Sequence, residues 1–217
     1  MAKSKRGGGQ RKSKSRKGRQ SQSRRLNWGP NVSGKQRSRD RLIVGVILAV
    51  VIVGGGAFIW NLTRATSDFD ALAASGVDAL ERVQTFPSDG NDHLPIGQRI
   101  TYRSQFPTSG DHDSRPLRAG FYTEPQWPER LVHSQEHGHI VIYYDELDPV
   151  DQAVIEEWTG LFTGVWDGVL AVPMPGIGQR VVLATWNRLL RLRRFDPAAA
   201  AAFIDAYRGR GPEQRVR

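Results

Sequence analysis

A continuous apolar run is the feature that most constrains how this chain can fold. The 19 residues from Leu42 to Trp60 include no charged side chain. At about 1.5 Å per residue, a helix of this length spans the roughly 30 Å hydrocarbon core of a bilayer. Arg41 precedes the run, and Trp60 lies at its other end, where an interfacial aromatic residue is favoured. The run therefore predicts one transmembrane helix over residues 42–62.

Basic residues are concentrated before this run. Residues 1–41 hold 15 of the 31 Lys+Arg and only one acid, Asp40, whereas Arg64 is the only basic residue among the eighteen that follow Trp60. The positive-inside rule places the N-terminus in the cytoplasm and the rest of the chain outside the cell membrane. A cleavable signal peptide is the alternative, with a weak cleavage site at Ala65–Ser67. Its apolar core would be shorter, so an uncleaved, single-pass signal-anchor is favoured.

Composition divides the chain into five parts. Residues 1–41 are expected to be a disordered basic arm, because almost nothing in them can be buried. The helix over 42–62 leads through a juxtamembrane segment, 63–75, to an extracytoplasmic domain, 76–213, and a short tail, 214–217. Anionic lipid head groups are the expected partner of the arm, at about 1 kcal/mol per basic residue near the surface. Nucleic acid is disfavoured, because no aromatic residue precedes Trp28 and no recognition pattern is present.

The external part is long enough for one domain with its own core. Its mixed helix and strand patterns predict an α+β fold, with a small mixed or antiparallel sheet and two or three helices. Asp148 and Asp196, each followed by proline, predict two helix starts, and Ser67 is expected to cap a short helix to Ala74. Strands are expected at Ile100–Tyr102, Gly120–Thr123, Ile140–Tyr144, Val165–Val172 and Val181–Trp186.

Histidines are the best clue to function. The chain has five and no cysteine, which excludes disulfides and thiolate ligands. Three of them, His133, His137 and His139, lie beside Glu136 just before the predicted strand Ile140–Tyr144, and the other two lie upstream in loop-like sequence. Imidazoles from separate loops suit zinc or Cu(II). The sequence therefore predicts a Cu or Zn site made by His93, His112, His133 and His137, with Glu136 as a fifth ligand or as the acceptor that orients an imidazole. Asp92, Asp111 and Asp113 could orient the imidazoles in the same way.

Other interpretations stay open. His133-x-x-Glu136-His137 spells a metallohydrolase pattern with Glu136 as general base, but this needs a helix, and Gly138 with the strand-like run behind it opposes one. The domain could instead be an interaction module for an envelope protein, with structural histidines and contacts through Trp127, Trp158 or Trp166. For Met174, a gap-filling role in the core is favoured over an axial copper ligand. The Arg188–Arg194 run is expected to be a solvated face.

Several short motifs resemble a bacterial family of membrane-anchored domains of unknown function, number 3105. The likeness covers about residues 76–213 and implies an extracytoplasmic domain behind one helix, without an established activity. It places His93, His112, His133, Glu136 and His137 at motif positions and leaves His139 outside. The segments that carry it are Asp92-His93, Thr108-Ser-Gly-x-His112, Gly120-x-Tyr122-x-x-Pro125, Val132-His-Ser-x-Glu-His-Gly138, Thr185-Trp186 and Phe203-Ile204.

Overall fold

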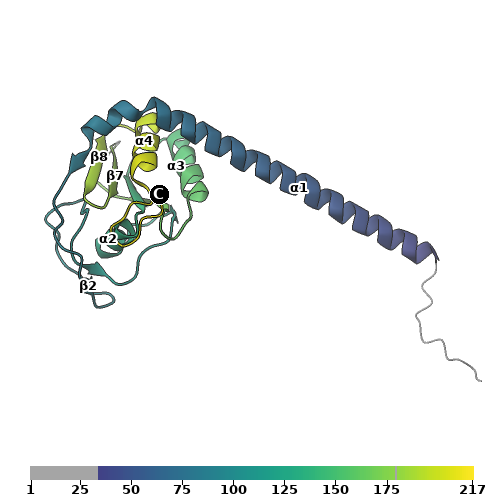
Figure 1. Ribbon diagram of the computed structural model, residues 1–217, viewed down its shortest axis with the longest axis horizontal. Helices are drawn as coiled ribbons and strands as arrows, with labels where there is room; N and C mark the ends of the chain where they lie inside the picture. The colour runs from purple at the N-terminus through teal and green to yellow at the C-terminus, as the bar shows by residue number, and fades with distance from the viewer. Residues whose placement is uncertain (1–33, 179) are drawn as a thin grey trace, which may run out of the picture. The chain divides into compact units, whose positions relative to one another are not determined.

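A computed structural model describes residues 34–178 and 180–217, without the side chains of 34–40 and 57–63 (Figure 1). Residues 1–33 of the predicted basic arm therefore lie outside the description. The first element is the helix α1, Gly34–Ser75. It continues through Ser67, so Ser67 is not an N-cap and the short helix predicted to end at Ala74 is the end of α1.

The predicted membrane span over 42–62 is not confirmed. Within the part of the chain that the structure describes, no helix combines the length and the apolar character needed to cross a bilayer. The side chains of positions 57–62 lie outside that part. Ten aliphatic side chains of α1 between Leu42 and Val53 are each 54–71% exposed.

A six-stranded mixed sheet forms the centre of the domain, in the order β1-β8-β7-β5-β6-β4. The central strand β5 runs parallel to β6 and antiparallel to β7. The predicted α+β class with a mixed sheet is thus confirmed. The strands are β1 (Gln84–Thr85), β4 (Gly120–Phe121), β5 (Ile140–Tyr144), β6 (Val169–Pro173), β7 (Val181–Thr185) and β8 (Arg188–Leu192).

Alternating side chains of β5 give the sheet two buried faces. Ile140 and Ile142 face a cluster made with the end of α1, with α3 (Pro149–Leu161) and with α4 (Pro197–Tyr207). Val141 and Tyr143 face a second cluster, which includes Leu131 of the helix α2 (Pro128–Glu136). The labels α3 and α4 in Figure 1 mark the helices of the first face. The domain is therefore three layers thick, with α2 and the long loops on the face opposite α3 and α4.

Both predicted helix starts are confirmed. The side chain of Asp148 accepts hydrogen bonds from the backbone of Val150 and Asp151, and that of Asp196 accepts one from Ala199. Among the strands, β5 has the predicted bounds, whereas β6 begins only at Val169 because 165–167 form a turn. Residues 100–102 form no strand. Val77–Arg82 forms the 3-10 helix η1.

The main correction concerns residues 128–136, which form the helix α2. Pro128 is at its start, with Glu129 in the first turn, a combination that favours a helix N-terminus. Gly138 has a φ of 90°, a left-handed conformation that suits glycine at a helix end. The strand-like run therefore does not oppose a helix before it, because Gly138 lets the chain change from helix to strand within three residues.

Candidate metal centre

Two short strands place His93 beside His112. β2 (His93–Leu94) pairs in parallel with β3 (His112–Asp113), and the register sets His93 opposite His112. The two ring centroids are 5.0 Å apart. The backbone N–H of His112 donates to the Asp92 carbonyl at 3.0 Å, and that of Gly110 to the Gly90 carbonyl at 2.9 Å. The pairing of these strands therefore brings together two histidines that are far apart in sequence.

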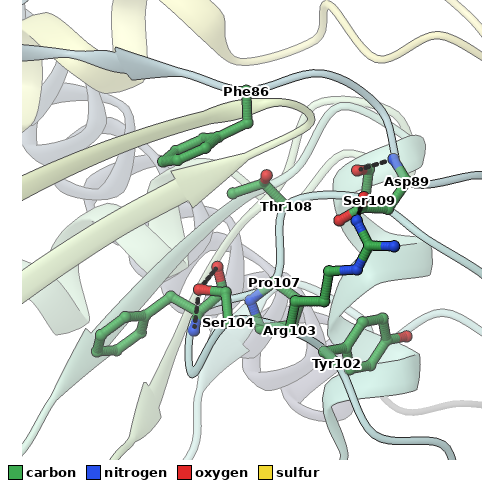
Figure 2. A pocket seen from close by; sticks show the side chains of 9 residues that line it. Phe86, Asp89, Tyr102, Arg103, Ser104, Pro107, Thr108 and Ser109 are labelled. Atoms are coloured by element: carbon green, nitrogen blue, oxygen red, sulfur yellow. Dashed lines mark hydrogen bonds and ion pairs between the residues drawn. The ribbon is translucent and has the colours of Figure 1, made fainter.

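The loop before β3 is held by the segment that precedes β2. Figure 2 shows Asp89 facing Ser109, and the backbone N–H of Asp89 donates to the Ser109 hydroxyl at 2.9 Å. Arg103 forms an ion pair with Asp89 at 3.3 Å, and the Asn187 N–H donates to the Thr108 carbonyl at 2.9 Å. The pocket between these segments is about 60 Å³, room for about two water molecules. This region therefore supports β3.

The helix α2 supplies the other side chains of the site. His133 and His137 lie one turn apart, with their Nε2 atoms 3.1 Å from each other. Glu136 points toward the paired strands: its Oε2 lies 3.0 Å from Nε2 of His112 and 3.6 Å from Nε2 of His93. One ligand atom from each of His93, His112, His133 and Glu136 lies within 4.8 Å of all the others. These four residues are called the four-residue group below.

Backbone carbonyls fix two of these imidazoles. Nδ1 of His112 donates to the Gly110 carbonyl at 2.8 Å, and Nδ1 of His133 donates to the Asp113 carbonyl at 2.7 Å. A carbonyl oxygen only accepts, so the ring proton of each neutral histidine sits on Nδ1. Each Nε2 of a neutral ring is then an acceptor: that of His112 lies 3.0 Å from Glu136, and that of His133 lies 3.1 Å from Nε2 of His137. A hydrogen bond from the other ring nitrogen is the usual support of a metal-bound histidine.

Three of the four residues are buried. His112, His133 and Glu136 are 0%, 4% and 5% exposed, whereas the His93 side chain is 49% exposed. Burial, together with the neighbouring His137, His112 and His93, lowers the pKa of His133 to about 4, although the hydrogen bond that its ring donates to the Asp113 carbonyl raises it. His133 is therefore neutral near pH 7, the state in which imidazole binds a metal.

The contact between Nε2 of His112 and Oε2 of Glu136 requires a proton or a metal ion. With its proton on Nδ1, neutral His112 turns a bare Nε2 toward a carboxylate oxygen 3.0 Å away. Two acceptors at this distance repel, so the contact requires either a proton on one of them or a metal ion that both bind. Ligands 2.0–2.1 Å from a tetrahedral zinc are about 3.3 Å apart. The measured separations of 3.0 and 3.6 Å between Glu136 and the two histidines lie on either side of this value.

A second group shares His133. Nε2 of His137 lies 3.0 Å from Oε2 of Glu213, and His133, His137 and Glu213 also have ligand atoms within 4.8 Å of one another. The ring of His137 packs against Trp166, with centroids 4.1 Å apart, and its buried Nδ1 has no hydrogen-bond partner among the described residues. His133 has one free ring nitrogen, so it can serve only one group at a time. The four-residue group offers three imidazoles, and the second group offers two.

The predicted residues therefore separate. His93, His112, His133 and Glu136 come together, whereas His137 lies outside the four-residue group. His139 stays outside both groups: its Nε2 donates to the Val165 carbonyl at 2.7 Å, and burial lowers its pKa.

The other candidates have different surroundings. Asp113 helps through its backbone carbonyl, while its carboxylate contacts Arg115 and the Gly97 N–H. Met174 is partly buried against the second core cluster, as expected of a gap-filler. Trp158 is buried in the first cluster, and Trp127 is 45% exposed. Glu213 was missed in the sequence because it follows the last helix in a segment with no metal-binding pattern.

The helix α2 also changes the hydrolase interpretation. The helical context that the His-x-x-Glu-His pattern needs is present, contrary to the prediction. Glu136, however, is already engaged: one oxygen contacts His112 and His93, and the other accepts a hydrogen bond from Asn91 at 3.4 Å. Glu136 therefore lies among the prospective ligands of the four-residue group.

Comparison with known proteins gives one match. No curated protein and no solved structure shows significant similarity to the chain. The profile of a family described as "Protein of unknown function (DUF3105)" matches residues 93–217, more than half of the chain. The match begins at His93 and includes every residue of both candidate metal groups. The chain therefore belongs to the DUF3105 family of proteins of unknown function.

Proposed function

We propose that this protein is a membrane-anchored extracytoplasmic domain that binds one transition-metal ion, zinc or copper, through His93, His112, His133 and Glu136. One observation carries the proposal: three histidines and a buried carboxylate each place one ligand atom within 4.8 Å of the others, and backbone carbonyls fix two of the imidazoles. Neutral imidazole and carboxylate suit zinc and Cu(II), and the chain has no thiolate to offer. A bound ion would act as a Lewis acid, with the exposed His93 on the side open to solvent.

Metal analysis of purified full chain with single variants tests this assignment. We expect about one zinc or copper per chain in the natural protein. His112→Ala and Glu136→Gln should lose it, because each removes a ligand of the four-residue group. His137→Ala is the matched control, since it removes a buried histidine of the same cluster that is not in this group. It should keep the ion.

The same experiment tests the hydrolase alternative. A hydrolase of the His-x-x-Glu-His type would hold its ion with His133, His137 and Glu213 and keep Glu136 as general base. Metal lost in His137→Ala but kept in Glu136→Gln would favour that arrangement and contradict ours. A natural protein that never contains metal would reject both and favour the interaction module with structural histidines.

Membrane anchoring is supported by α1. Soluble proteins rarely expose large contiguous apolar surfaces, and ten aliphatic residues between Leu42 and Val53 are more than half exposed on one helix. Lipid would cover such a surface, and the basic residues before it would contact anionic head groups in the cytoplasm.

Fractionation and proteolysis of whole cells test the anchor and its orientation. We expect the protein to stay in the membrane fraction after alkaline carbonate washing. When the envelope layers outside the cell membrane are permeabilised and that membrane stays intact, added protease should cleave residues 65–217. A cytoplasmic marker protein should be spared in the same sample. Release by carbonate, or protection of the domain until the cell membrane is lysed, would contradict the proposed anchor or its orientation.

A further inference from the structure

Three arginines converge on one pocket at the C-terminal side of the domain. The pocket has a volume of about 170 Å³. Its lining brings together the end of β7, the start of β8, the last residue of α4 and the segment after it. The lining residues are Thr185, Trp186, Arg188, Tyr207, Arg210 and Arg215.

The three arginines of this pocket have, in the described part of the chain, no carboxylate beside them to balance their charge. Among the described residues, no carboxylate lies within 4.0 Å of the guanidinium of Arg188, Arg210 or Arg215. Acidic residues are nevertheless plentiful, since residues 42–217 hold 21 of the 22 Asp+Glu. Nearby arginines do find them: Arg208 pairs with Asp167, and Arg217 pairs with Asp205 at 2.8 Å. Single arginines elsewhere among the described residues, such as Arg118 and Arg193, also have no carboxylate within 4.0 Å, but this pocket gathers three such guanidinium groups in its lining.

The backbone holds two of these charges together. Arg210 and Arg215 face each other in an isolated antiparallel bridge. Directly opposed residues of such a bridge project to the same side, and like charges there destabilise the pairing. Arg188 is fixed from β8, with its guanidinium 4.9 Å from the ring centre of Tyr207. A stacked guanidinium keeps its N–H donors free at the edge of its plane.

We propose that this pocket binds a phosphate-type oxyanion, either free phosphate or the phosphate of a lipid head group. Guanidinium donors match the oxygens of such an anion, and three of them would neutralise its charge. The volume corresponds to that of about five to six water molecules, enough for one tetrahedral anion with some water. The site is separate from the four-residue group, although the Trp186 ring lies 6.2 Å from that of His112. The proposal does not depend on metal binding.

Titration of the purified full chain in neutral detergent with inorganic phosphate tests the site. We expect saturable binding that weakens as salt is raised. Arg188→Gln should weaken binding roughly tenfold or more, since it removes charge-assisted hydrogen bonds. The double variant Arg210→Gln, Arg215→Gln should weaken it further and should still fold, because it also removes a repulsion. Arg193→Gln, an exposed arginine just after β8, is the matched control and should bind as the natural protein does.

Two further measurements identify the source of the anion and test whether a bound metal holds it. A soluble short-chain phosphatidylglycerol, which carries a phosphodiester, replaces phosphate in one measurement, and tighter binding of either probe identifies the source. His112→Ala in the other measurement should keep phosphate binding, which excludes phosphate held by the metal. The proposal is overturned if neither probe binds saturably, if Arg193→Gln weakens binding as much as Arg188→Gln, or if only His112→Ala abolishes it.

Discussion

Zinc or copper should raise the melting temperature of the metal-free protein by roughly 8–16 °C when the free ion is about a thousand times its Kd. An ion that binds only the folded state stabilises it by about 4 kcal/mol at that excess. For a domain of this size, each kcal/mol shifts the melting temperature by about 2–4 °C. The four-residue group draws on three separate segments, β2, β3 and α2, so unfolding must destroy it. Thermal unfolding of the chelator-treated full chain, with and without added ion, measures the shift.

Variants distinguish the specific site from surface binding of the ion. His112→Ala should lose most of the shift, and His137→Ala should retain it. Excess chelator should return the natural protein to its metal-free melting temperature. An equal shift in the natural protein and His112→Ala would mean that the ion acts elsewhere and would contradict the proposed site.

Gly76→Ala should destabilise the domain by roughly 3 kcal/mol or more, the cost of severe overpacking. Gly76 connects α1 to η1 and lies against the first turn of α4. A Cβ at this position would lie 1.9 Å from the Ala198 carbonyl oxygen and 2.8 Å from the Ala199 nitrogen. Both are backbone atoms, so no side-chain rotation relieves the overlap and α4 must move. Equilibrium urea unfolding of metal-free protein measures the loss.

Gly160→Ala provides a control of opposite sign. Gly160 is exposed in α3, and a Cβ there would meet nothing within 4 Å. Alanine in a helix is favoured over glycine by up to about 1 kcal/mol, so this variant should be as stable as the natural protein or more so. If Gly76→Ala unfolds at the same urea concentration as Gly160→Ala, that result contradicts the close contact between α4 and Gly76.

Local patterns in the sequence predicted the parts of the fold that depend on neighbouring residues. The buried run Ile140–Tyr144 has the predicted bounds, and the Asp-Pro pairs at 148 and 196 mark true helix starts. Prediction failed at α2, because Gly138 and the strand-like run behind it oppose a helix in the sequence, whereas the structure ends the helix just before them. The polar side chains from His133 to Glu136 are also buried. Buried polar residues weaken the amphipathic pattern by which a helix is normally recognised.

The candidate site was predictable in its residue types but not in its arrangement. Concentration of histidine identified three imidazoles and the carboxylate of the four-residue group. The pairing of β2 with β3 was not predictable, because each strand has two residues and the contact depends on backbone hydrogen bonds. The acceptors that fix His112 and His133 are backbone carbonyls. Every residue has such a carbonyl, so these two hydrogen bonds cannot be recognised in the sequence. The second group, in which His137 joins His133, was not predictable either, because it depends on Glu213 of the C-terminal segment.

The register that sets His93 opposite His112 has a mechanical consequence in a chain without cysteine. An ion bound to both would tie the ends of the intervening loop, as a disulfide does in many small secreted domains. Closing a loop of this size by a disulfide is worth about 3 kcal/mol. Unlike a disulfide, a zinc cross-link would withstand reductants and would open when a chelator removes the ion, so the order of the loop would follow metal supply.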